Sequence, residues 1–378
     1  MQFIDLQAQR LRIEKEINAA LATVIEHGRY IMGPEVGRLE SELAAFVGSS
    51  HCVGCSSGTD ALLMALMAFE VGPGDAVLTT PFTFFATAEV ISLLGATPVF
   101  VDVDPRTYNI SPEALAVVAN KVKTEGKLRL RGVVTVDLFG LPCDYERIMP
   151  IAEKHDMFIV QDAAQACGAI YRGKRVPTQG HIGTTSFFPA KPLGCYGDGG
   201  AVFTDDPILA EKLRSIRVHG KGNDKYNNVR IGLNARLDTL QAAIVLEKLK
   251  IYPDEIERRQ RVASAYSAGL SDVAGLTPPV VPDGSQSVWA QFTVRAADST
   301  ARSAAQAALK EKGIPTAIYY IKPLHLLEAF RHLGYREGDF PVSETASTQV
   351  FSLPFHPYLE NEEIEKICGI LRKEAAGR

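Results

Sequence analysis

The chain has 378 residues, a formal net charge of -4 and an apolar fraction of 46%. This length suits one large domain with a smaller one, and the slight acidic excess argues against a nucleic-acid partner. The first residues lack the basic and apolar segments of a signal peptide. No apolar run reaches the roughly 20 residues that a membrane-spanning helix needs. We therefore expect a cytoplasmic protein that binds neither nucleic acid nor a membrane.

Short apolar segments alternate with helix-like segments between about residues 50 and 205. The predicted strands are 51–55, 76–79, 97–101, 132–136, 157–161, 184–187 and 200–204. The predicted helices are 61–69 and 146–154, followed by 237–249 and 255–261. Several strands are apolar on both faces, which is typical of a mainly parallel sheet covered by helices on each side. The pattern predicts an α/β fold.

Composition changes near Asp272, after which glycine and proline are frequent as far as Ser287. We interpret this stretch as the entrance to a smaller α+β unit that ends in a helix at 362–373. Residues 15–250 are assigned to a large ligand-binding domain and residues 251–378 to a small C-terminal domain. Residues 1–14 are expected to pack on the small one.

The six cysteines follow no disulfide or metal pattern. Cys52 and Cys55 have the spacing of a metal or redox motif, but no second pair or histidine cluster accompanies them. We expect a reduced pair on a buried strand, and no metal site.

The segment Ser56 to Ala61 follows a predicted strand and opens a helix. Free backbone N–H groups and the helix dipole make such a position an anion site, which the hydroxyl of Thr59 can complete. An ordinary helix start capped by Ser57 or Thr59 is the alternative. The glycine patterns of Walker and dinucleotide-binding loops are missing.

Asp162 ends a buried strand, and the carboxyl ends of strands in open α/β sheets face the ligand crevice. A buried carboxylate there needs a cationic partner. A protonated pyridine nitrogen is one such partner, and holding its proton makes the ring an electron sink. A helix cap or a structural ion pair remains the alternative role.

Lys191 lies beyond a predicted strand and before the glycines at 197, 199 and 200. Its amine could form a Schiff base if desolvation or a nearby cation lowered its pKa. A lone lysine at such a place is usually a solvated surface residue. The ordered set of anion site, aromatic residue, strand-end aspartate and lysine favours the nucleophile.

The chain resembles the DegT/StrS family of nucleotide-sugar aminotransferases from about Phe3 to its C-terminal helix. The segments that carry the resemblance are 58–62, 161–165, 186–191 and 232–236. The resemblance implies the aspartate-aminotransferase fold, fold type I, and pyridoxal 5'-phosphate as cofactor. It also implies a homodimer with shared active sites.

Site residues follow from the same resemblance. Lys191 matches the lysine that carries the cofactor, Asp162 the partner of the pyridine nitrogen, and Gln165 the residue that bonds the ring hydroxyl. Phe84 matches the aromatic residue that stacks on the ring. The matches to phosphate ligands are Gly58, Thr59, the backbone at Asp60, Ser186 and, from the neighbouring subunit, Asn234. Ala190 departs from the serine expected before the lysine.

The resemblance also suggests the substrates. Pro192 and the stretch 236–243 favour the subgroup that aminates UDP-2-acetamido-2-deoxy-3-keto-glucuronic acid, with glutamate as expected donor. Arg236 could pair with the sugar carboxylate, and Tyr319 and His325 lie in a segment that resembles a substrate-facing one. The alternative acceptor is a 4-keto-6-deoxy or 3-keto-6-deoxy nucleotide sugar. Rival functions are a sugar dehydratase, against which Lys191 argues, and a non-catalytic regulator that binds the cofactor.

Overall fold

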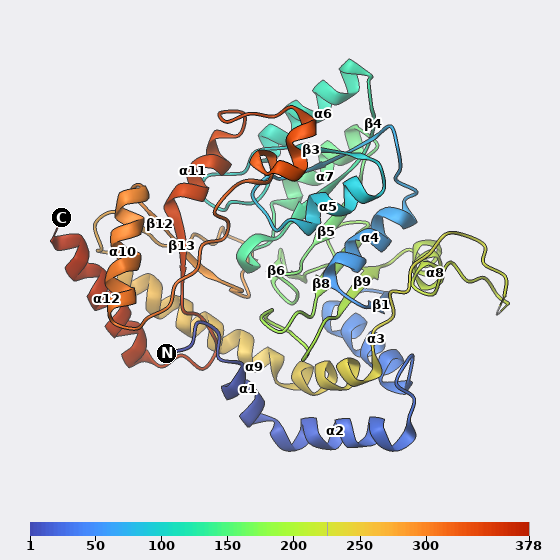
Figure 1. The fold of residues 1–378 in the computed structure, drawn as a ribbon, viewed down its shortest axis with the longest axis horizontal. Helices are drawn as coiled ribbons and strands as arrows, with labels where there is room; N and C mark the ends of the chain where they lie inside the picture. Colours follow the sequence, from blue (N-terminus) through green and yellow to red (C-terminus); the bar gives the residue numbers. More distant parts are fainter. Residues whose placement is uncertain (225, 378) are drawn as a thin grey trace.

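A computed structural model describes residues 1–224 and 226–377 (Figure 1). Its centre is a seven-stranded sheet in the order β1-β9-β8-β5-β4-β2-β3. The strands are β1 (His51–Cys55), β2 (Asp75–Thr79), β3 (Thr97–Phe100), β4 (Arg129–Val136), β5 (Phe158–Asp162), β8 (Ile182–Ser186) and β9 (Gly200–Thr204). The strand β9 runs antiparallel to its neighbours β1 and β8, and the other six strands of this sheet share one direction. The structure confirms the mainly parallel sheet and each of its predicted strands.

Helices cover both faces of this sheet. They are α3 (Pro34–Val47), α4 (Gly58–Ala68), α5 (Ala86–Leu93), α6 (Pro112–Glu125), α7 (Tyr145–Lys154) and α8 (Pro207–Ile216). On β5, Ile159 packs in the core formed with α6 and α7, whereas Val160 packs in the core formed with α4, α5 and α8. Because both faces of the strands are buried, several of them carry apolar residues on both faces instead of alternating apolar and polar ones.

The longest helix, α9 (Thr239–Leu270), has 32 residues and crosses the lower part of the molecule (Figure 1). An amphipathic stretch at 237–249 that leads into a polar helix at 255–261 was expected here, and the structure joins both in one helix that continues to Leu270. Pro253 lies inside the continuous helix. Side chains near its start, such as Leu246, belong to the core beneath β1 and β9, and those near its end, such as Tyr266, belong to the C-terminal core. Burial of both halves holds the helix together across the proline.

A second sheet carries the C-terminal core. It consists of the antiparallel strands β10 (Leu276–Thr277), β12 (Phe292–Ala296) and β13 (Val350–Leu353), covered by α10 (Ser299–Glu311) and α12 (Asn361–Ala376). A small third sheet joins β11 (Ser285–Gln286), β6 (Ile170–Tyr171) and β7 (Lys174–Arg175).

The connection from α10 to β13 returns to the large sheet. It contains the 3-10 turns η2 (Leu324–Leu326) and η3 (Glu328–Leu333) and the helix α11 (Pro341–Gln349). The Leu324 amide donates to the carbonyl of Pro81 at 2.8 Å, and the carboxylate of Asp102 accepts from the amides of Val342 and Ser343 at 3.0 Å each. These bonds tie the connection to loops that follow β2 and β3.

The N-terminal helices α1 (Leu6–Arg12) and α2 (Glu14–His27) lie along the outer side of α9 (Figure 1). Gln9 donates to the carboxylate of Glu255 on α9 at 2.9 Å. The carbonyl of Phe3 accepts from the amide of Phe355, just after β13, at 3.0 Å. The first residues therefore contact the region that also carries the second sheet.

A buried ion pair fixes the strand β1 against its helices. Arg217, which follows α8 with a side chain only 6% exposed, pairs with Glu40 on α3. The same Glu40 oxygen accepts from the amide of Gly54 on β1 at 2.9 Å, and Arg217 donates to the Gly54 carbonyl at 2.9 Å. Each charge is thus compensated by the other and by the strand's backbone.

We predict that Glu40→Ala destabilises the protein by about 3–5 kcal/mol, because it leaves a buried guanidinium without its carboxylate. Glu42→Ala is the matched control on the same helix. It removes the partner of Arg38 in an exposed pair and should change the stability by less than about 1 kcal/mol. Urea unfolding of both variants measures the difference, and equal effects would contradict the assignment.

Candidate active site

Several strands of the large sheet end at the same edge. Their ends surround a cavity of about 460 Å³. The carboxyl ends of β1, β5 and β8 meet there with the start of β9, since Gly200 is in register with both Cys55 and Ser186. The residues that line the cavity and carry polar side chains are Ser57, Thr59, Thr83, Thr87, Asp162, Gln165, Ser186, Lys191, Asp198, Gln291, Tyr319 and Tyr320.

The N-terminus of α4 forms one end of the cavity. Ser57 is the helix cap and accepts from the amide of Asp60 at 3.0 Å. No hydrogen-bond acceptor within the described chain is recorded for the amides of Gly58 and Thr59. A Cβ at Gly58 would lie 2.6 Å from the Cβ of Ser186, so only glycine allows the helix to start this close to β8. The result is an anion cradle with free amides and two nearby hydroxyls, those of Thr59 and Ser186.

Asp162 is buried at the end of β5, with 6% of its surface exposed. One carboxylate oxygen accepts from the Ala164 amide at 3.1 Å and the other from the Thr87 hydroxyl at 3.0 Å. Burial raises the pKa of Asp162, and these two hydrogen bonds oppose the rise. Within the described residues no ion pair includes this carboxylate, so it faces the cavity without a direct cationic partner.

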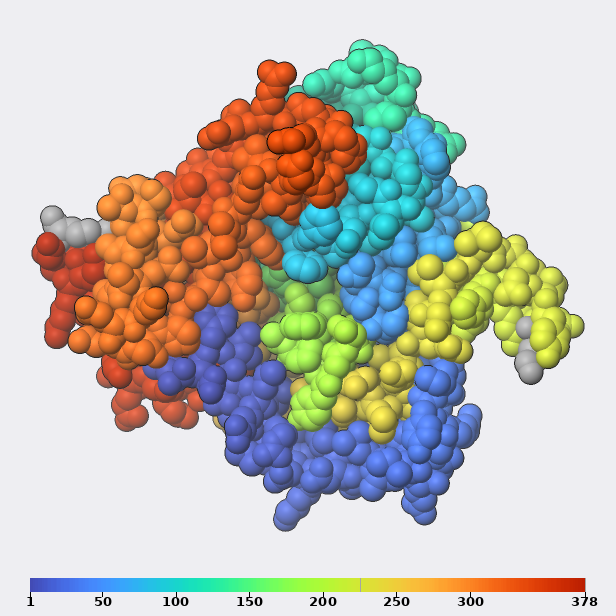
Figure 2. Space-filling model, viewed as in Figure 1, coloured from blue at the N-terminus to red at the C-terminus, as the bar shows by residue number. Residues whose placement is uncertain are grey.

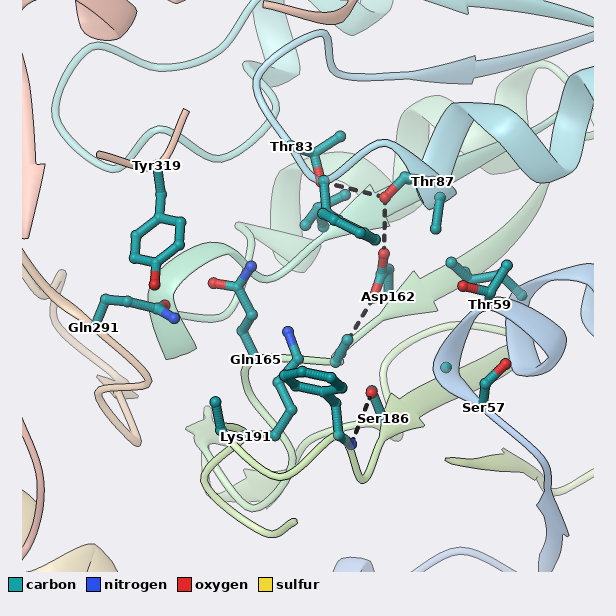
Figure 3. A pocket seen from close by; sticks show the side chains of 18 of the residues that line it. Ser57, Thr59, Thr83, Thr87, Asp162, Gln165, Ser186, Lys191, Gln291 and Tyr319 are labelled. Atoms are coloured by element: carbon teal, nitrogen blue, oxygen red, sulfur yellow. Dashed lines mark hydrogen bonds between the residues drawn. The ribbon is translucent and has the colours of Figure 1, made fainter. Parts of the chain in front are cut away.

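Lys191 points into the cavity from the side opposite Thr87, and its amine ends near Asp162 and Gln165 (Figure 3). Burial lowers the pKa of the amine, and the negative charge of Asp162 partly offsets that effect. A lowered pKa increases the fraction of neutral amine, which is the nucleophilic form.

Three further predicted residues lie on the cavity wall. Phe84 is 58% exposed, so its ring is free to contact a ligand. Gln165 accepts from the Phe139 amide at 2.8 Å and donates to the Tyr320 hydroxyl at 3.2 Å. Tyr319 stands at the end of the cavity away from α4 (Figure 3).

Other predicted residues lie outside this wall. The Asp60 amide is already bonded to Ser57. Asn234 is exposed and Arg236 is half-buried, and neither lines the cavity of its own chain. His325 is buried in η2 against Glu344 at 3.0 Å, and burial lowers its pKa.

The sequence reading missed Thr87 and Gln291. Thr87 bonds directly to Asp162, and the buried amide oxygen of Gln291 has no partner within the described chain. The only sequence signal for Thr87 was that it follows Thr83 by four residues in the segment after β2. Nothing in the sequence around Gln291 marked it.

The six cysteines do not line the cavity. All six cysteines are buried and unpaired, and burial raises the pKa of Cys55 to about 12. Among the described residues there is no cluster of His, Cys, Asp and Glu that could hold a metal ion. None of the helices described is both long and apolar enough to span a bilayer.

Residues 11–372 match the DegT/DnrJ/EryC1/StrS aminotransferase family. The chain belongs to this family. It is 46% identical over 371 residues to the UDP-2-acetamido-2-deoxy-3-oxo-D-glucuronate aminotransferase of Pseudomonas aeruginosa, covering 98% of this chain and 99% of that protein. It is 44% identical over 377 residues to a pleiotropic regulatory protein of Geobacillus stearothermophilus, covering 98% of each.

The fold is also that of the family. The crystal structure of a DegT DnrJ EryC1 StrS aminotransferase from Brucella abortus superposes with a TM-score of 0.95, at 50% identity and over 99% of both chains. These findings confirm the predicted fold type, the enzyme class and pyridoxal phosphate as cofactor. The chain is an aminotransferase.

The cavity fits this cofactor. The anion cradle at α4 suits its phosphate, and the buried, cation-free carboxylate of Asp162 suits a protonated ring nitrogen. Bound there, pyridoxal phosphate supplies an electron sink and a carbonyl carbon that exchanges amino groups. Lys191 would hold the cofactor covalently. Once released, its amine would move protons as general base and acid, while the carboxylate of Asp162 would keep the ring nitrogen protonated.

We predict that the apoenzyme attaches pyridoxal phosphate with a pH midpoint below the ordinary lysine pKa of about 10.4. Attachment requires the neutral amine of Lys191, and burial keeps that amine neutral at lower pH. Asp162→Asn removes the charge that raises the lysine pKa, so its midpoint should move lower still. Attachment rates measured by absorbance across pH give both midpoints.

Lys191→Ala should show no covalent attachment and no turnover, whereas Lys154→Ala, at an exposed position on α7, should behave as the wild type. A midpoint that rises in Asp162→Asn, or normal attachment by Lys191→Ala, would contradict the roles given to these residues.

Proposed function

We propose that this aminotransferase transfers an amino group from glutamate to the 3-keto group of UDP-2-acetamido-2-deoxy-3-keto-glucuronic acid, in the biosynthesis of a cell-surface polysaccharide such as an O-antigen. The observation that carries the proposal is the 46% identity, over nearly the full length of both chains, to the Pseudomonas aeruginosa enzyme named for this sugar. The competing acceptor is a neutral 4-keto-6-deoxy or 3-keto-6-deoxy nucleotide sugar.

Charge distinguishes the two acceptors. Lys191 is the single cationic side chain among the described residues that line the cavity. A uronate, a diphosphate and the donor's carboxylates all need further cations, and arginine suits carboxylates because it binds them in a bidentate way. Arg236 has a buried Nε without a partner in the described chain. We propose that its guanidinium binds the sugar carboxylate.

Arg236 does not reach the cavity of its own chain, which supports a homodimer with shared sites. The segment that follows α8 projects from the body of the molecule (Figure 2). On it, Val229 is 53% exposed and Ile231 86% exposed, so both apolar side chains are free to contact a partner. We propose that this segment delivers Asn234 and Arg236 to the partner's cavity.

We further place the enzyme in the cytoplasm, where glutathione keeps thiols reduced. The six unpaired cysteines agree with such a compartment.

We predict that Arg236→Leu lowers kcat/KM on the uronate by about ten- to a hundredfold, because a charge-assisted pair is worth about 1.5–3 kcal/mol. On a neutral 6-deoxy analogue, the same variant should change little. Kinetics on a panel of keto-sugar nucleotides provides the comparison. Arg230 is the fallback partner, and a uronate-specific loss in Arg230→Leu instead would assign the carboxylate to it. Equal losses on both substrates would indicate phosphate binding instead, and a wild-type preference for the neutral sugar would refute the uronate.

We also predict complementation between the inactive Lys191→Ala and the impaired Arg236→Leu. Mixed dimers of Lys191→Ala with Arg236→Leu should regain some activity towards the uronate, because one of the two sites then contains both intact residues. Lys191→Ala mixed with Asp162→Asn is the matched control and should stay inactive, because both residues line the same cavity. Differently tagged subunits allow the mixed dimers to be isolated. Isolated mixed dimers of the first pairing that are no more active than the Arg236→Leu enzyme alone would refute shared sites.

A further inference from the structure

Two threonines lie behind the carboxylate of Asp162 and form a chain of hydrogen bonds with it. Thr87 Oγ1 is 3.0 Å from Asp162 Oδ2, and Thr83 Oγ1 is 3.2 Å from Thr87 Oγ1 (Figure 3). All three side chains are buried, with exposed fractions of 2% for Thr83, 1% for Thr87 and 6% for Asp162. Water therefore competes little for these bonds.

The hydrogen positions in this chain follow from simple counting. An ionised carboxylate only accepts, and a threonine hydroxyl has a single hydrogen to donate. The hydrogen of Thr87 must therefore point at Asp162, and Thr83 must donate to Thr87. Successive bonds of this kind polarise and strengthen one another in a low-dielectric interior.

Packing around Thr87 does not require a hydroxyl group. It lies in the first turn of α5 between the buried alanines Ala86 and Ala88. Valine has the same shape as threonine, and a buried hydroxyl is unfavourable unless it is hydrogen-bonded. The hydrogen bonds recorded for this hydroxyl within the described chain are those to Asp162 and Thr83.

We propose that Thr87 is a positioning residue that keeps Asp162 ionised and oriented towards the cofactor's ring nitrogen, with Thr83 as its supporting donor. The Ala164 amide holds one carboxylate oxygen and Thr87 holds the other, so the carboxylate cannot rotate freely. Burial favours the protonated acid, and the hydroxyl opposes this. Without the hydroxyl, the proton shared with the ring nitrogen should move towards the carboxylate, and the ring becomes a poorer electron sink.

The test uses the cofactor alone, so it does not depend on the identity of the sugar. Thr87→Val should weaken pyridoxal phosphate binding to the apoenzyme by about ten- to a hundredfold, the effect of losing one hydrogen bond to a charged group. With 15N-labelled cofactor, the ring-nitrogen NMR shift should move towards its unprotonated value. Thr87→Ser should restore both properties. Thr83→Val should change both in the same direction but less.

Thr204→Val is the matched control. Thr204 is a buried threonine at the other end of β9, and its hydroxyl donates to the carbonyl of His181 at 2.9 Å. This variant should lose some stability but keep the cofactor affinity and the ring-nitrogen shift. If Thr87→Val does not fold, Thr87→Ala carries the same expectation. The proposal would be overturned by a folded Thr87→Val or Thr87→Ala variant whose affinity for the cofactor is within threefold of the wild type and whose ring-nitrogen shift is unchanged.

Discussion

The buried carboxylate of Asp162 is the constraint on which the rest of the site depends. It ends β5 in the middle of a sheet whose two faces are covered by helices, so water solvates it poorly. A charge in such a place is tolerated only with compensation. The chain itself supplies two hydrogen bonds and the more distant amine of Lys191. A cationic ring nitrogen would complete the compensation, and the same contact would favour the electron-withdrawing, protonated form of the cofactor.

Sheet topology explains how residues far apart in sequence meet around this carboxylate. Parallel strands end at the same edge, so the residues after β1, β5 and β8 converge without any long loop. The reversal of β9 brings Gly200 to that edge as well, where a Cβ would lie 2.5 Å from the carbonyl of Ser57. Close packing of the strand ends thus shapes the end of the cavity at the N-terminus of α4.

Sequence patterns predicted the parts of the site that depend on residues close together in the sequence. Asp162 ends a strand that is recognisable by its apolar residues, Lys191 stood out by its place in the ordered set of motifs, and the α4 cradle follows from a strand-to-helix junction. The continuous helix α9 was not predictable, because Pro253 normally interrupts helices and only burial on two cores overrides it. Thr87 was not predicted, because its hydrogen-bond partner Asp162 lies 75 positions away in the sequence. Asn234 and Arg236 do not line the cavity of their own chain, so the roles proposed for them depend on a second copy.

The helix α9 has a consequence for how the protein unfolds. Its first half packs beneath the large sheet and its second half against the small one, without a break between them. Additional hydrogen bonds from Leu324 and Asp102 tie the C-terminal connection back to the large sheet. Unfolding either core would expose apolar side chains of α9, and the other core needs the same helix to stay folded. Although the two cores are built on separate sheets, they should therefore lose their structure together, as a single cooperative unit.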